Sequence, residues 1–165
     1  MVLTIAELTR RFARDGRVVW IGVRPERRAP MVSLEQAMIG LGGLEGDRRK
    51  HPGKRAVTLI QSEHLPVIAS LAGRDGVSPS DLRRNIVVEQ INLRALRDRD
   101  IRVGDAVLRL TGPCDPCGLM ERVIGHGGYN AMRGHGGMTA EVLQAGAVAV
   151  GSAVIPVPAP TPDNP

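Results

Sequence analysis

The sequence predicts a small domain made mainly of β-strands with a few short helices, an α+β protein whose strands form a curved mixed sheet or barrel. Three observations lead to this fold class. Short β-branched and apolar runs recur along the chain of 165 residues, the helical patterns between them are brief, and strands do not alternate with long helices as in a doubly wound parallel sheet. The core must be mostly aliphatic, because the chain holds one Phe, one Trp and one Tyr.

The first forty residues predict a helix, a strand and a second helix. In residues 1–16 the spacing of Thr4 and Glu7 is that of a capping box, so an N-terminal helix is expected. The run RVVWIGVRP (17–25) is β-branched and ends in a proline, which predicts a strand. The run SLEQAMIG (33–40) repeats the capping spacing and predicts one or two turns of helix.

The middle of the chain alternates loops, strands and short helices. Residues 41–55 are polar and rich in glycine, which predicts a long loop, and residues 56–60 then predict a short strand. A helix is expected over 62–73, with its proline near the first turn. A shorter helix is expected over 78–85, followed by a strand over 86–90.

The last third of the chain again favours β structure. Residues 101–112 predict two strands that meet at Gly104 and Asp105, and residues 117–125 predict a helix. Further strands are expected over 138–146 and 147–157. The remaining residues, 158–165, are proline-rich and polar, which predicts a flexible tail after a main domain over 17–157.

Charge and composition exclude several classes of function. The net charge of +5 comes almost entirely from arginine, but no run of five like charges and no cluster of aromatic residues marks a nucleic-acid-binding protein. No apolar stretch is long enough for a signal peptide or a membrane span. Two cysteines do not make a disulfide framework. We therefore expect a cytoplasmic protein that binds a small molecule, with no nucleic-acid or membrane partner.

The two cysteines lie in one proline-containing turn, TGPCDPCGLM (111–120). Cys117 stands where a helix is expected to begin, and a helix start favours the thiolate form that attacks sulfur or binds metal. Cys117 is therefore the candidate nucleophile or metal ligand, and Cys114 is a candidate resolving partner. A plain redox dithiol and two buried structural thiols are the alternatives.

A zinc site is a further alternative. Cys114 and Cys117 would need two more ligands, and His126 and His135 follow in the glycine-rich loop GHGGYNAMRGHGG (125–137). This spacing falls outside the usual zinc pattern. A small zinc-stabilised binding module therefore stays open as the second hypothesis.

Three loops carry groups that could hold an anion. The glycine loop lets the backbone approach a ligand and offers Arg133. The loop LEGDRRKHPGKR (44–55) gathers Arg48, Lys54 and other cations, and Arg84 and Asn85 precede a strand. Solvated surface charge is the alternative explanation for each.

Taken in order, these segments resemble the MOSC domain family, named from the C-terminus of molybdenum cofactor sulfurases. The resemblance runs from about Val18 to Val154 and is closest to stand-alone bacterial members. The segments that carry it are LEGDR (44–48), VTLIQSEHL (57–65), LRRNIVV (82–88), IRVGDAVLRLTGPCDPCGLME (101–121), the glycine loop and VGSAV (150–154).

The resemblance implies a compact β-barrel and a set of site residues. The family's essential cysteine, in a Pro-Cys pair, falls on Cys117, which the resemblance makes a molybdenum ligand. Its Arg-Asn pair falls on Arg84 and Asn85, and its acidic-glycine loop falls on Glu45, Gly46 and Asp47. Arg48, Lys54 and Arg133 complete the predicted cofactor-binding set.

The family association further implies molybdenum cofactor, or sulfur carried as a Cys117 persulfide. The enzyme activities implied are reduction of N-hydroxylated compounds and sulfur transfer. Pyridoxal phosphate would act only through a partner cysteine desulfurase, because the chain has no attached desulfurase domain. A reductase role would likewise need an external electron-donor protein.

Overall fold

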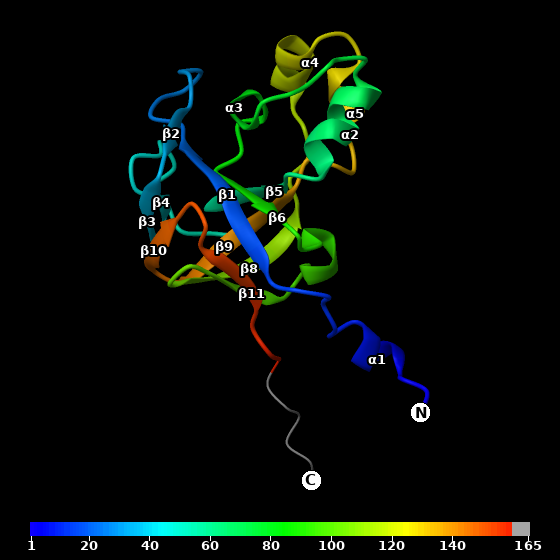
Figure 1. Cartoon of the computed structure of the whole chain (residues 1–165). Helices are drawn as coiled ribbons and strands as arrows, with labels where there is room; N and C mark the ends of the chain where they lie inside the picture. Colours follow the sequence, from blue (N-terminus) through cyan, green and yellow to red (C-terminus); the bar gives the residue numbers. More distant parts are fainter. Residues whose placement is uncertain (160–165) are drawn as a thin grey trace.

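In the computed structural model, which describes residues 1–159, seven strands close into a mixed β-barrel. Around the barrel the strands follow the order β1 (Gly16–Val23), β6 (Ile86–Glu89), β5 (Val57–Gln61), β9 (Met138–Gln144), β8 (Ala106–Pro113), β7 (Asp100–Val103) and β11 (Ala153–Pro156). The predicted mainly β, barrel-like fold is confirmed (Figure 1).

The barrel closes where its first strand meets its last. Gly16 and Arg17 of β1 pair antiparallel with Val154 and Ala153 of β11. Every pairing around the barrel is antiparallel except that of β5 with β6. The crossover between these two parallel strands carries helices α2 (His64–Leu71) and α3 (Pro79–Leu82), as a parallel connection requires a long crossover.

A small second sheet flanks the barrel. It consists of β10 (Gly146–Ala149), β3 (Gln36–Gly40) and β4 (Gly43–Leu44), while β2 (Val32–Leu34) pairs with β1. The predicted helix over 33–40 is therefore wrong. Ile39 is buried and pairs with Gly146, a partner more than a hundred residues away that no local capping pattern reveals.

The helices lie at one end of the barrel. There α2, α3, α4 (Gly118–Ile124) and α5 (Gly128–Met132) gather, whereas α1 and the residues just after β11 lie at the opposite end (Figure 1). The short helix expected over 78–85 is present as α3, and Ser78 and Asp81 form a capping box at its start. The helix α5 lies within a loop for which the glycine-rich sequence predicted no regular structure. A single turn of 3₁₀-helix, η1 (Leu93–Leu96), joins β6 to β7.

The N-terminal helix is much shorter than predicted. The capping box of Thr4 and Glu7 forms, but α1 spans only Ile5–Leu8 of the expected residues 1–16. The apolar side chains of Ile5 and Leu8 stay exposed, so no tertiary packing extends the helix. The protein's remaining helices each bury at least one apolar side chain.

Two apolar clusters hold the fold together. The larger fills the barrel with aliphatic side chains such as Val18, Leu59 and Leu108. The smaller lies between the barrel and the helices, and includes Ile68, Met120 and Met132. The helix end is thus fixed to the barrel by packing, which gives the loops between these helices a rigid support.

Across residues 1–159, no helix combines the length and the apolar character needed to cross a membrane. Of the predicted flexible tail over 158–165, residues 160–165 lie outside the described part of the chain.

Candidate functional site

Cys117 stands at the start of α4, as the sequence predicts. Its backbone is extended (φ −121°, ψ 173°), and its carbonyl accepts the first hydrogen bond of the helix, from Met120, at 2.9 Å. The side chain makes no capping hydrogen bond, and the residue is exposed. The thiol is therefore free to react with, or coordinate, a group that arrives from solvent.

Cys114 differs from Cys117 in its exposure to solvent and in the contacts of its backbone. It is buried, and its backbone N–H donates to the carbonyl of Gly137 at 2.8 Å. Its own carbonyl accepts a hydrogen bond from Arg84 at 3.0 Å. Of the two free thiols, that of Cys114 lies in the protein interior and that of Cys117 lies at the surface.

Arg84 holds the cysteine turn in place from the protein interior. The side chain is buried, and its guanidinium donates to the carbonyls of Leu82 (2.8 Å), Cys114 (3.0 Å) and Gly136 (2.8 Å). Burial lowers the pKa of Arg84, while the negative charges of Cys114 and Cys117 as thiolates would raise it. A buried cation therefore ties the end of α3 to the cysteine turn and the glycine loop.

The glycine loop packs closely against the cysteine turn and against β5 because two of its residues lack a side chain. A Cβ on Gly136 would lie 2.4 Å from the carbonyl oxygen of Cys114, and one on Gly137 would lie 1.9 Å from that of Leu59. Gly137 also has a φ of +87°, which favours glycine. Side chains at these two positions would therefore displace the loop from the cysteine turn or from β5.

A second polar cluster surrounds Asp47, which is 2 % exposed. Its carboxylate accepts hydrogen bonds from the backbone and guanidinium of Arg24 (2.9, 3.0 and 3.1 Å), from Asn85 (2.9 Å) and from the backbone of Arg49 (2.9 Å). Asn85 also bonds to Thr58 and Gly22. We call this the Asp47 network. Its members support the loop after β4 from inside.

Asp47 stays ionised in this network. Burial raises the pKa of Asp47, but the hydrogen bonds from the side chain and backbone of Arg24 and from the backbone of Arg49 outweigh it, so the pKa lies below its ordinary value. The carboxylate is therefore a fixed negative charge that neutralises Arg24.

Arg83, next to Arg84, belongs to a different environment. It ends α3 with a left-handed backbone (φ 57°), and its guanidinium donates to the carbonyl of Ala29 at 2.7 Å. Burial lowers the pKa of Arg83, and the positive charges of Arg24 and Arg48 lower it further. The charges of Asp47 and of Cys117 act in the opposite direction. Arg83 thus experiences the positive charges of two other arginines together with the opposing charge of Cys117.

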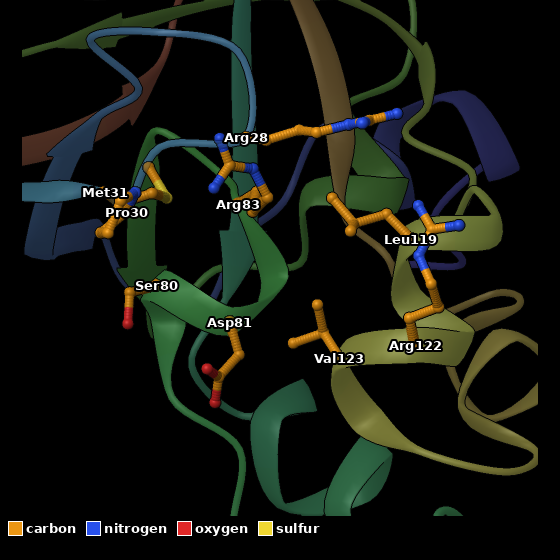
Figure 2. A pocket seen from close by; sticks show the side chains of 9 residues that line it. All are labelled: Arg28, Pro30, Met31, Ser80, Asp81, Arg83, Leu119, Arg122 and Val123. Atoms are coloured by element: carbon orange, nitrogen blue, oxygen red, sulfur yellow. The ribbon is translucent and has the colours of Figure 1, made fainter.

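A cavity of about 500 Å³ opens beside Arg83 and the first turns of α4. Figure 2 shows α3 and the segment before β2 on one side, with the side chains of α4 opposite. The cavity presents three cations and one acid, together with apolar groups: Arg28, Arg83, Arg122, Asp81, Pro30, Met31, Leu119 and Val123, with Ser80 at the rim. We call this the arginine pocket.

Comparison of sequences decides the family. The profile of the MOSC domain matches residues 41–155, well over half of the chain. The chain belongs to the MOSC domain family. No curated protein sequence matches it.

Solved structures share the MOSC barrel. YuaD from Bacillus subtilis is similar with a TM-score of 0.76 and 16 % identity, over 86 % of this chain and 94 % of that one. YiiM from Geobacillus stearothermophilus is similar with a TM-score of 0.70 and 18 % identity, over 87 % of this chain and 75 % of that one. YiiM from Escherichia coli has a TM-score of 0.68 and 18 % identity, over 87 % and 70 %. At these identities the likeness concerns the fold.

The predicted site residues of this MOSC chain fall into three groups. Cys117 and Arg48 carry charges that act on Arg83. Arg84, Asn85 and Asp47 are buried, and their side chains are bonded inside the protein. Lys54 and Arg133 are exposed, and neither side chain makes a hydrogen bond or ion pair within residues 1–159. The prediction that each contacts a cofactor stays a prediction.

The acidic-glycine loop divides between two places. Asp47 points into the network with Arg24, whereas Glu45 is exposed and lines a different cavity near the small second sheet. Neighbours in sequence thus face different parts of the MOSC domain. A motif alone does not reveal which of them serves the site.

The structure does not gather the four residues of the zinc alternative into one ligand group. In the described residues, no three or more His, Cys, Asp and Glu side chains are close enough to hold a metal ion. His126 is exposed beside Glu121, and His135 packs edge to face on His64 with ring centroids 5.5 Å apart. The buried Cys114 and the exposed Cys117 are not joined by these histidines.

Several residues of the site were missed by the sequence reasoning. Arg24, Arg28 and Arg122 were not selected, because isolated arginines carry no motif in a chain rich in them. Glu121 was also missed. It accepts hydrogen bonds from the backbones of Gly127 (2.8 Å) and Tyr129 (2.9 Å), and these bonds lower the pKa of Glu121 and tie α4 to α5.

Proposed function

We propose that this MOSC protein binds molybdenum cofactor through Cys117 and reduces N-hydroxylated small molecules. The observation that carries the proposal is the exposed thiol of Cys117 at the start of α4, the helix whose Leu119 and Arg122 line an arginine-rich cavity of about 500 Å³. When bound, the cofactor would supply a sulfur-coordinated metal able to pass electrons to an N–O bond. In the overall reaction a hydroxylamine takes up two electrons and two protons, its N–O bond breaks, and an amine and water form.

The residues present fit such a cofactor. A soft thiolate ligand suits a sulfur-rich metal centre, and Cys117 offers one that no internal hydrogen bond occupies. The cofactor also carries a phosphate, and arginine holds phosphate well. Arg83, Arg48 and Arg122 supply cations around the thiol and the arginine pocket.

The buried residues would act as supports. Three guanidinium nitrogens of Arg84 donate to backbone carbonyls. Its role would therefore be to fix the cysteine turn and to supply a buried positive charge next to it. The Asp47 network would hold Arg24 close to Arg83 without leaving a free acid at the surface. Preorganised supports of this kind keep a site in one geometry.

The decisive experiment is metal and pterin analysis of protein made in a host that synthesises molybdenum cofactor. We expect molybdenum and pterin in the wild-type chain, near loss of both in Cys117→Ser, and retention in Cys114→Ser, the matched control. Reductase activity with an external electron donor should follow the metal content. A Cys117→Ser protein with undiminished molybdenum and activity would refute the assignment.

Sulfur transport is the second candidate, favoured by the exposure of one thiol alone. In that role the Cys117 thiolate attacks the outer sulfur of a desulfurase persulfide, so a new S–S bond forms on Cys117 and the desulfurase thiolate leaves. Incubation with a cysteine desulfurase, pyridoxal phosphate and cysteine would then add about 32 Da to the intact mass. The mass gain should vanish in Cys117→Ser, and its absence from the wild type would exclude this role.

A further inference from the structure

The first eight residues form an arm with an uncovered apolar side. Val2 is 95 % exposed, Ile5 75 % and Leu8 47 %. Figure 1 shows α1 projecting from the barrel at the end opposite the other helices. Contiguous exposed apolar groups of this kind mark a contact surface. We call residues 1–8 the N-terminal arm.

The arm has a fixed base. The guanidinium of Arg99 donates to the carbonyl of Thr9 at 2.9 Å and lies 5.5 Å from the ring centroid of Phe12. Phe12 in turn packs against the barrel core. Because the chain is anchored immediately after the arm, the apolar side chains are held away from their own barrel.

The base of the arm is also positively charged. Arg10, Arg11 and Arg14 are exposed, and none of them forms a salt bridge among the described residues. Glu7, the acid on α1, is engaged with the backbone and hydroxyl of Thr4 in the capping box. An apolar segment followed by unpaired arginines suits a partner surface that is apolar with acids at its edge.

Such a surface exists elsewhere on the same protein. A groove of about 570 Å³ lies between the small second sheet and the turn from β7 to β8. Its floor is apolar, with Leu34, Ala37, Met38, Ala147 and Val148. Its charged residues are Glu45 and Asp105, both exposed, and none of the residues that line it is basic. We call this the small-sheet groove.

The arm and the groove lie at opposite ends of one strand. Arg99, which anchors the arm, precedes β7, whereas Gly104 and Asp105 of the groove follow it. The arm leaves from the far end and projects outward, so a second copy of the chain can present its groove to it. In a two-fold dimer each copy would give an arm and receive one.

We propose that the protein forms a reciprocal dimer in which the N-terminal arm of each copy binds the small-sheet groove of the other. Ile5 and Leu8 enter the apolar floor, and the arginines that follow the arm face Glu45 and Asp105. The arginine pocket and Cys117 lie at the helix end of the barrel and stay open. This assembly does not depend on the cofactor assignment.

Light scattering on the full chain after gel filtration, at micromolar concentration and low salt, tests the dimer. The wild type should have about twice the 17.7 kDa mass of one chain. The variant Ile5→Asp with Leu8→Asp should raise the dissociation constant by about a hundredfold or more, because four apolar side chains leave the interface. The matched control changes Val67 and Leu71 to Asp, which are exposed apolar residues of α2, and should remain dimeric.

A charge exchange tests which surface receives the arm. Arg10→Glu with Arg11→Glu should weaken the dimer, and adding Glu45→Arg with Asp105→Arg should restore it. Circular dichroism melting identifies any variant that is unfolded, and Met38→Glu in the groove gives a second route to the same result. A monomeric wild type, a dimer that survives the arm variants, or a charge exchange without restoration would each overturn the proposal.

Discussion

The Asp47 network and the surroundings of Arg83 lie side by side and use the same kinds of residue, yet their charges are balanced differently. In the network, a carboxylate, an amide and Arg24 satisfy one another at 2.9–3.3 Å. Around Arg83, burial and the charges of Arg24 and Arg48 lower the pKa of the Arg83 guanidinium. The negative charge of Asp47 opposes this effect only in part. The charges of the first region are balanced by internal hydrogen bonds, whereas the positive charge of the second is only partly balanced.

The largest expected effect comes from breaking the balanced region. Asp47→Ala removes the acceptor of Arg24 and leaves a largely buried cation, which should lower the free energy of unfolding by about 4 kcal/mol. Urea denaturation measures this loss. Asp75→Ala, at an exposed acid outside the network and the groove, is the control and should change stability by less than about 0.5 kcal/mol. Equal effects of the two changes would show that the network does not stabilise the fold.

The next effect in size concerns Arg84. Arg84→Met leaves three backbone carbonyls without their donors and should cost about 3 kcal/mol of unfolding free energy. Arg133→Met, at an exposed arginine, provides the comparison and should be nearly neutral. If Arg84→Met were as stable as the wild type, Arg84 would belong with the ligand-binding cations rather than with the supports.

Arg83→Gln should separate binding from stability. The single bond to Ala29 accounts for about 1 kcal/mol of stability, so the melting temperature should change little. Molybdenum content should fall roughly tenfold, because a cation beside the thiol is lost. Arg109→Gln, at an arginine paired with Asp100 on the exposed barrel wall, should keep its metal. Full metal content in Arg83→Gln would remove Arg83 from the proposed site.

The smallest effect is a difference in acid sensitivity. Because the folded-state pKa of Asp47 lies below its ordinary 3.8, its contribution to stability is complete above that value and is lost as the pH falls through the folded-state pKa. Melting temperatures measured from about pH 6 down to about pH 2 should therefore fall more steeply for the wild type than for Asp47→Asn. Parallel curves would contradict this assignment.

Local signals in the sequence were enough to predict most of the barrel. The strands at 17–25, 56–60, 86–90 and 101–112 follow from β-branched runs, and the cap at Ser78 follows from its spacing to Asp81. The helix predicted over 33–40 was wrong because the strand β3 in this segment depends on pairing with residues 146–149. Helix α5 was missed because its glycine-rich sequence does not favour a helix by itself. Glu121 of α4 stabilises its first turn through hydrogen bonds from the backbones of Gly127 and Tyr129.

The site was only partly predictable, for a related reason. Cys117 could be found, because a proline-cysteine turn before a helical pattern is a local feature. The division of roles between Arg83 and Arg84 could not, because the two are neighbours in sequence and differ only in what the folded chain brings to them. Arg24 and Arg122 reach the site from segments nearly a hundred residues apart.

The pairing of Gly16 and Arg17 with Val154 and Ala153 has a consequence for biosynthesis. A nascent chain cannot complete the barrel until its final strand has left the ribosome, and contacts between such distant residues form slowly. The cysteine turn is translated before that strand, so its thiols stay unshielded in the meantime. Any delivery of metal or sulfur to Cys117 that needs the finished site must therefore wait until β11 has emerged and paired with β1.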